Sequence, residues 1–179
     1  MIVALYFGSF NPIHIGHISI CKFIIDNNKA DELRLIVSPR NPLKDESFSL
    51  NSRERLDNVK SAILKCGLES RVVVSDIEYS MSPPYYTIKT LRKFKELEPN
   101  NRFVLVIGAD NLQIIEKWYL WRDLLLEFEI WVYPRSGVDI ESLCKKYGCK
   151  KLNAPLIEIS STKIREAEKM GLDMSRFRV

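Results

Sequence analysis

This 179-residue sequence contains no apolar run longer than a strand, so we expect no segment that crosses a membrane. Its first residues also lack the basic and then apolar pattern of a secretory signal peptide. We therefore expect a cytoplasmic protein without a membrane partner. No internal repeat, low-complexity tract or linker divides the sequence, which predicts one domain over residues 1–179. Assembly into a homo-oligomer stays open.

Cysteine is also scarce: there are four, and their spacing is not that of a disulfide framework. We expect free thiols in a reducing compartment. Cys144 and Cys149 lie five residues apart, but no second pair of metal ligands follows them, which disfavours a zinc site. The net charge of +4 suits an anionic ligand, but it is too small and too dispersed to indicate a nucleic-acid partner.

Histidine is scarce as well, and its placement is informative, because the only two in the chain, His14 and His17, lie in one short segment. The apolar residues 2–7 predict a buried strand that ends at Gly8, residues 9–12 a turn, and residues 15–25 an amphipathic helix. Such a strand, turn and helix N-terminus form a seat for phosphate, because backbone N–H groups and the helix dipole point toward the turn. Both histidines share one face of the first helical turn and could donate to the same anion. One alternative is that the two histidines are surface or helix-capping residues. A second is a metal site, but no carboxylate or cysteine lies close in sequence to complete it.

The remaining segments alternate between the two types of secondary structure. Apolar-rich runs, several of them uniformly apolar, predict strands over residues 32–38, 71–76, 103–107, 129–133 and 156–159. Helices are predicted over residues 52–66, 85–97 and 139–147, with a broken helical stretch around Trp118 and a last helix after Thr162. This order predicts an α/β fold with a doubly wound, Rossmann-like parallel sheet.

Small and polar residues follow three of the predicted strands. Beside the histidine turn, these are Gly108-Ala109-Asp110 and Ser160-Ser161-Thr162. Ligands of doubly wound sheets bind beyond the carboxyl ends of the strands, so these segments predict a nucleotide pocket. Ser160 to Thr162 would either cap the last helix or, together with Arg165 one turn later, hold a polyphosphate from a second side.

Other residues have both a structural and a binding interpretation. Asp110 resembles a ribose hydroxyl acceptor and also a helix N-cap. Trp118 or Tyr119 could stack on an aromatic ligand, whereas core packing is the better interpretation of Trp121 and Trp131. Arg40 and Lys44 could add positive charge from a loop. No cysteine or serine lies beside a histidine–carboxylate pair in the sequence, which disfavours a covalent intermediate.

Taken together, these motifs resemble a known family. Gly8-Ser9-Phe10-Asn11-Pro12-x-His14-x-Gly16-His17 and Ser160-Ser161-Thr162-x-x-Arg165 are similar to the end motifs of the nucleotidyltransferase α/β-phosphodiesterase superfamily. Pro84-Tyr85-Tyr86-Thr87-Ile88-x-x-Leu91, Ile107-Gly108-Ala109-Asp110 and Trp118-Tyr119 resemble its bacterial nicotinate mononucleotide adenylyltransferase branch. The resemblance covers essentially the whole chain. It implies that ATP and nicotinate mononucleotide are converted to nicotinate adenine dinucleotide and pyrophosphate, with Mg²⁺ carried on ATP, in NAD biosynthesis.

The resemblance also assigns roles to residues of this sequence. The catalytic residues would be His14, His17 and Arg165. The nicotinate mononucleotide would contact Lys44, the backbone N–H groups of Thr87 and Tyr119, and the ring of Trp118. ATP would contact both histidines and Arg165, together with Gly8, Ser9, Phe10, Gly108, Asp110, Ser160, Ser161 and Thr162. No dedicated metal ligand is implied.

Three features depart from the family pattern. Asn11 stands where many members have Asp, and Leu43 stands before Lys44 where many have His. The chain ends at Val179, about one helix earlier than the resemblance leads us to expect.

Several related functions compete with this one. Adenylyltransferases for nicotinamide mononucleotide or phosphopantetheine have related chemistry, and cytidylyltransferases for glycerol phosphate share the end motifs. The sequence has no Lys-Met-Ser-Lys-Ser loop and is too short for an aminoacyl-tRNA synthetase. A non-enzymatic nucleotide sensor on the same fold is disfavoured, because binding alone does not need groups that stabilise transition-state charge.

Overall fold

The computed structural model describes residues 1–40 and 51–179. Its centre is a six-stranded sheet in which all the paired strands are parallel. The strands follow the order β3-β2-β1-β4-β5-β6, which confirms the predicted doubly wound α/β fold. Their bounds are β1 Ile2–Gly8, β2 Glu32–Val37, β3 Val72–Ser75, β4 Arg102–Gly108, β5 Glu129–Tyr133 and β6 Lys150–Lys151.

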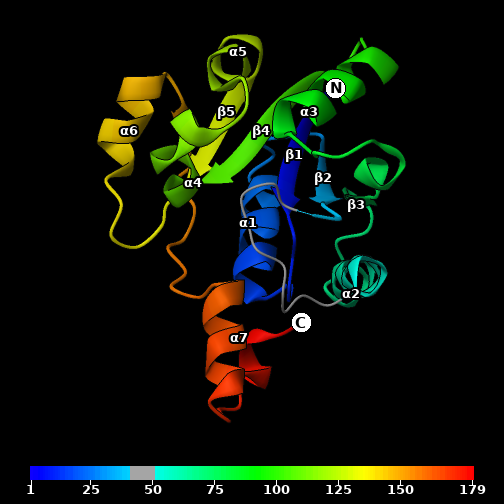
Figure 1. Cartoon of the computed structure of the whole chain (residues 1–179), viewed down its shortest axis with the longest axis vertical. Coiled ribbons are helices and arrows are strands. Elements are labelled where there is room, and N and C mark those ends of the chain that lie inside the picture. Colours follow the sequence, from blue (N-terminus) through cyan, green and yellow to red (C-terminus); the bar gives the residue numbers. More distant parts are fainter. Residues whose placement is uncertain (41–50) are drawn as a thin grey trace.

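Helices cover both faces of the sheet and form two cores (Figure 1). The α-helices are α1 Ile15–Asp26, α2 Ser52–Lys65, α3 Thr87–Leu97, α4 Ala109–Gln113, α5 Trp121–Glu127, α6 Ile140–Tyr147 and α7 Ser161–Lys169. Three 3-10 helices are η1 Ile77–Ser80, η2 Ile115–Lys117 and η3 Ser175–Phe177.

Alternate residues of the central strand β1 point into different cores. Ala4 and Tyr6 pack with α1 and α2, whereas Val3 and Leu5 pack with α3, α4, α5 and α6. Burial on both faces explains why the two central strands, β1 and β4, are almost continuously apolar instead of alternating. The prediction that Trp131 packs in the core is confirmed, since it is 3% exposed.

The predicted strand over residues 156–159 is wrong. Only Lys150 and Lys151 pair with β5, and the chain then leaves the sheet. Pro155 has no N–H to donate to a strand ladder, and Leu156 is 51% exposed. Residues 152–160 instead form a connection without regular secondary structure that leads to the start of α7.

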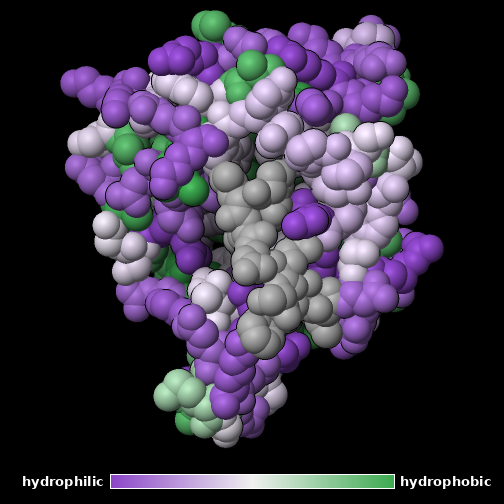
Figure 2. Space-filling view, in the orientation of Figure 1, coloured by the Kyte–Doolittle hydropathy of each residue, from purple (hydrophilic) through white to green (hydrophobic). Residues whose placement is uncertain are grey.

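The surface in the same orientation is mostly hydrophilic, with hydrophobic residues in small separate groups (Figure 2). Within residues 1–40 and 51–179, no helix has both the length and the apolar character needed to span a bilayer.

Candidate active site at the carboxyl ends of the strands

The carboxyl ends of β1 and β4 lie next to each other at the point where the strand order reverses. Two neighbouring cavities open at this edge. We call one the histidine cavity; its lining includes Phe10, His14, His17, Asp110, Arg135, Ser160, Ser161 and Thr162. We call the other the tryptophan cavity; its lining includes Tyr85, Tyr86, Thr87, Lys117, Trp118 and Tyr119. Gly8 and Ser9 line both.

The two histidines cap the start of α1 with their Nδ1 atoms. His14 is the N-cap residue, and its Nδ1 accepts from the N–H of Gly16 at 3.1 Å. The backbone N–H of His14 donates to Nδ1 of His17 at 3.2 Å. The rings stack with their centroids 3.7 Å apart. Because Nδ1 of each ring accepts, the proton of each neutral imidazole is placed on Nε2, where it can be donated to a ligand.

Burial keeps His14 uncharged at neutral pH. The residue is 3% exposed, and burial together with the positive charge of Arg135 lowers its pKa to about 4. Gly16 makes room for this ring, because a Cβ atom at that position would lie 2.8 Å from Cε1 of His14. The backbone before the helix is shaped by Phe10, which has a left-handed φ of 47° and packs its ring edge-on against His17.

The start of α7 is fastened to this turn, although it lies about 150 residues away in sequence. Ser160 caps α7 by accepting from the N–H of Lys163 at 3.2 Å. Ser161 donates its hydroxyl to the carbonyl of Pro12 at 2.8 Å. Arg165 donates to the carbonyl of Asn11 at 2.5 Å and to Oγ1 of Thr162 at 3.3 Å. The guanidinium of Arg165 thus holds the turn, and Arg165 is not among the lining residues of either cavity.

The end of β4 contributes Gly108 and Asp110. Asp110 lies in the first turn of α4 but makes no side-chain capping bond to it. Its carboxylate instead faces Arg135, with Oδ1 at 3.8 Å from Nε. A Cβ atom at Gly108 would lie 2.4 Å from Oδ1 of Asp110, so a larger residue at this position would displace that carboxylate.

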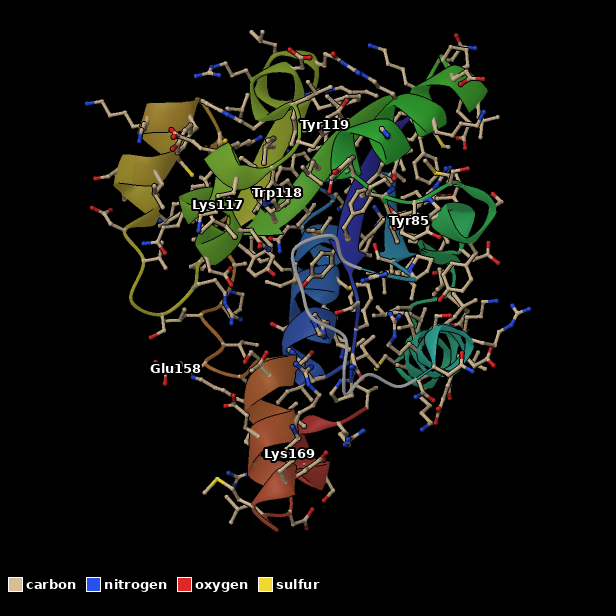
Figure 3. All side chains as sticks on the ribbon, viewed as in Figure 1. Tyr85, Lys117, Trp118, Tyr119, Glu158 and Lys169 are labelled. Atoms are coloured by element: carbon tan, nitrogen blue, oxygen red, sulfur yellow. The ribbon has the colours of Figure 1, made fainter. Side chains whose placement is uncertain are left out.

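The tryptophan cavity offers backbone and indole donors. The predicted donors, the N–H groups of Thr87 and Tyr119, have no protein acceptor within the part of the chain that the structure describes. Nε1 of Trp118 is buried and likewise has no partner there. Tyr86 and Tyr119 stack at a centroid distance of 4.4 Å and join the two segments that supply the donors. Figure 3 shows Tyr85 and the run Lys117, Trp118, Tyr119 approaching from these two segments, whereas Glu158 lies nearer α7.

Lys44, the last predicted substrate residue, lies outside the described residues.

Sequence reasoning missed two arginines at this edge. Arg135 follows β5 and lines the histidine cavity, and its position two residues after a predicted strand was the available signal. Arg55 is 1% exposed and donates from α2 to the carbonyls of Ser9, Ser38 and Pro39 at 2.7–2.8 Å. It binds the end of β2 to the histidine turn, and no local pattern distinguishes it from a solvated charge.

Across residues 1–40 and 51–179, no three His, Cys, Asp or Glu side chains are grouped so that they could hold a metal ion. Cys144 and Cys149, considered above for zinc, are free thiols, as are the other two cysteines.

Comparison with known proteins agrees with a nucleotide-binding site at this edge of the sheet. Residues 5–167 match the family model described as cytidylyltransferase-like. A protein of Porphyromonas gingivalis curated as a probable nicotinate-nucleotide adenylyltransferase is 38% identical over 175 residues, which are 97% of this chain and 87% of that one. A protein of Flavobacterium johnsoniae with the same curated name is 38% identical over 173 residues, 96% of this chain and 88% of that one.

A solved structure shares the fold over most of its length. The nicotinic acid mononucleotide adenylyltransferase of Plasmodium falciparum, complexed with NaAD, is 26% identical and has a TM-score of 0.77, covering 92% of this chain and 82% of that one. The chain therefore belongs to the cytidylyltransferase-like family of nucleotidyltransferases, in its nicotinate-nucleotide adenylyltransferase branch.

Proposed function

We propose that this protein transfers AMP from ATP to nicotinate mononucleotide, giving nicotinate adenine dinucleotide and pyrophosphate for NAD biosynthesis. The observation that carries the proposal is the pair of adjoining cavities at the switch point, which differ in their chemistry. The histidine cavity presents imidazole, hydroxyl and guanidinium donors suited to phosphates, and the tryptophan cavity presents rings and free N–H groups suited to an aromatic acid.

We assign the histidine cavity to ATP. Nε2 of His14 and His17 would donate to the reacting phosphates, and Asp110 would accept from the adenylyl ribose. Arg165 would position the histidine turn through Asn11 and move to the phosphates when they bind. The backbone around the turn and the α7 N-terminus would complete the anion site through Gly8, Ser9, Phe10, Gly108, Ser160, Ser161 and Thr162.

We assign the tryptophan cavity to the nicotinate mononucleotide. The pyridine ring would stack on Trp118, and its carboxylate would accept from the N–H groups of Thr87 and Tyr119. Both donors are in place without a protein acceptor among the described residues, which is the state expected of donors kept for a ligand. Lys44 would add a positive charge on this side.

The chemistry that these groups support is an in-line displacement. A phosphate oxygen of the mononucleotide forms a bond to the α-phosphorus of ATP, and the bond from that phosphorus to the bridging oxygen breaks. The electron pair leaves with pyrophosphate. A phosphate dianion needs no general base, so catalysis consists of positioning and of stabilising charge on the transferred group.

Mg²⁺ would enter as the complex of ATP, and it would supply charge neutralisation of the polyphosphate. ATP and four free thiols support a cytoplasmic location for the reaction.

The test is product formation by the purified protein with ATP and Mg²⁺. Nicotinate mononucleotide, phosphopantetheine and no acceptor would be supplied in parallel, with pyrophosphate release and dinucleotide measured by chromatography. We expect stoichiometric dinucleotide and pyrophosphate with the mononucleotide alone. Saturable ATP binding without either product would identify a nucleotide sensor, and product with phosphopantetheine would identify the other adenylyltransferase branch.

A further inference from the structure

The two cavities share a wall, and this wall marks where the reacting atoms meet if the proposed function holds. The shared lining residues are Tyr6, Phe7, Gly8, Ser9, Asn111 and Tyr133. The new bond joins the phosphate of one nucleotide to the α-phosphorus of the other. With one nucleotide in each cavity, that bond forms beside the shared wall.

Two of the shared residues present phenol hydroxyls to each other. The Oη atoms of Tyr6 and Tyr133 lie 3.3 Å apart, so one hydroxyl can donate to the other. When Tyr6 donates, Tyr133 accepts through its oxygen and keeps its own proton for another acceptor. Within the described part of the chain, no protein group accepts that proton. Burial raises the pKa of both phenols, so both are protonated at neutral pH.

The surrounding packing fixes the direction of the Tyr133 ring. Tyr133 stands beside Gly108 in the β4–β5 register. A Cβ atom at Gly108 would lie 3.0 Å from Cζ of Tyr133, so the ring lies flush against the glycine. Tyr6 packs edge-on against both Tyr133 and Phe10, at centroid distances of 5.7 Å. Rings held on strands and locked by neighbours give a donor that needs little reorganisation during the reaction.

We propose that Tyr133 is a further catalytic residue, whose phenol O–H donates a hydrogen bond to a non-bridging oxygen of the α-phosphoryl group during transfer. Tyr6 is a positioning residue that orients this hydroxyl through their mutual hydrogen bond. Tyr133 keeps its proton throughout, and bond making and breaking are those of the displacement described above. The inference rests on the proposed function, because it needs both nucleotides in their assigned cavities.

The experiment compares Tyr133→Phe with Tyr6→Phe, and the second variant is a matched control. Each substitution removes one hydroxyl and breaks the same tyrosine–tyrosine hydrogen bond, but only the first removes the donor to the phosphate. We expect Tyr133→Phe to lower kcat about 10²-fold with little change in either KM, because one donor to developing charge is lost. Tyr6→Phe is expected to lower kcat no more than about fivefold, the effect of losing one neutral hydrogen bond.

The double variant and two binding measurements complete the design. If Tyr6 acts through Tyr133, the double variant has the kcat of Tyr133→Phe alone. Thermal unfolding and direct ATP binding show whether each variant keeps its fold and its nucleotide site. Equal losses of kcat in the two single variants, or an unchanged kcat in Tyr133→Phe, would overturn the catalytic role of Tyr133. The proposed function would still hold in that case, because the wild-type protein is active. A wild-type protein that makes no dinucleotide would overturn both.

Discussion

At the scale of single residues, the histidine pair caps α1 and is also proposed to bind phosphate, two roles that the sequence presents as alternatives. Nδ1 of His14 and His17 caps α1, and this capping is what directs Nε2 of each ring away from the helix backbone. Capping thus fixes the tautomer that the proposed phosphate contacts need. The scarcity of histidine in the sequence pointed to this turn, but it could not indicate that capping and the proposed contacts use different nitrogens of one ring.

His17→Ala tests the catalytic role of this pair. We expect turnover at saturating substrates to fall about 10²–10³-fold, because a donor to the reacting phosphates is lost. Steady-state kinetics measures the effect, and circular dichroism shows whether the fold persists. Lys22→Ala, an exposed cation on the same helix outside both cavities, is the control and should keep wild-type turnover. Near-normal turnover in folded His17→Ala would exclude a transition-state role.

The lowered pKa of His14 predicts a pH dependence of stability. An unfolded chain binds a proton at this residue near pH 6.5, whereas the folded protein binds it near pH 4. The contribution of neutral His14 to the free energy of unfolding is therefore complete above pH 6.5 and is lost as the pH falls toward 4. A shift of this size corresponds to about 3 kcal/mol in the free energy of unfolding.

His14→Asn provides the comparison, because Asn also caps helices but does not titrate. Urea unfolding between pH 7 and pH 4 should show a steeper decline for the wild type than for this variant, since the carboxylates contribute equally to both. Parallel declines would mean that His14 titrates alike in the folded and unfolded chains.

At the scale of elements, α7 acts on the site through the turn that precedes α1. Ser161 and Arg165 bond to the carbonyls of Pro12 and Asn11, so the conformation of that turn depends on a helix from the other end of the chain. The local motifs predicted each half separately. Their direct contact could not be predicted, because it is decided by long-range packing.

Arg165→Ala is expected to raise the KM for ATP and to lower kcat by roughly 10-fold or more each, because Arg165 is proposed to contact phosphates in the ground state and in the transition state. Initial-rate kinetics with varied ATP measures both constants. Lys163→Ala on the same helix is the matched control, since its ammonium bonds the Glu158 carbonyl and lines neither cavity. If Arg165→Ala kept the wild-type kcat and KM for ATP, residues 160–165 would serve only to cap and anchor α7.

At the scale of the whole molecule, burial decided what the sequence could predict. Five of the six predicted strands are present, because burial on both faces of the sheet leaves apolar-rich runs in the sequence. The prediction for residues 156–159 was wrong, because that apolar run follows Pro155, which cannot donate to a strand ladder, and it begins with the exposed Leu156. Arg55, Arg135 and the Tyr6–Tyr133 pair were missed because only the strand order brings them to the site. The single domain and the homo-oligomer stay predictions.

Choice of pyridine substrate tests the arrangement of the two proposed donors in the tryptophan cavity. A nicotinate carboxylate accepts from both Thr87 and Tyr119, whereas an amide would turn its NH₂ toward one of them. We expect kcat/KM to favour nicotinate over nicotinamide mononucleotide by about 10²-fold or more, because a buried donor without an acceptor costs about 1–3 kcal/mol. Competition between the two mononucleotides, with products separated by chromatography, measures the ratio. Equal use would mean that the carboxylate is not bound by these N–H groups.

The bond between Ser161 and Pro12 also orders events during synthesis on the ribosome. The histidine turn is made among the first residues, but its partner in α7 follows about 150 residues later. At bacterial or eukaryotic elongation speeds of about 5–20 residues per second, the turn waits several seconds or more for that helix. A nascent chain can pair β1 with β2 early, yet the proposed anion site is completed only when α7 emerges. An unfinished chain would therefore lack the α7 part of that proposed site.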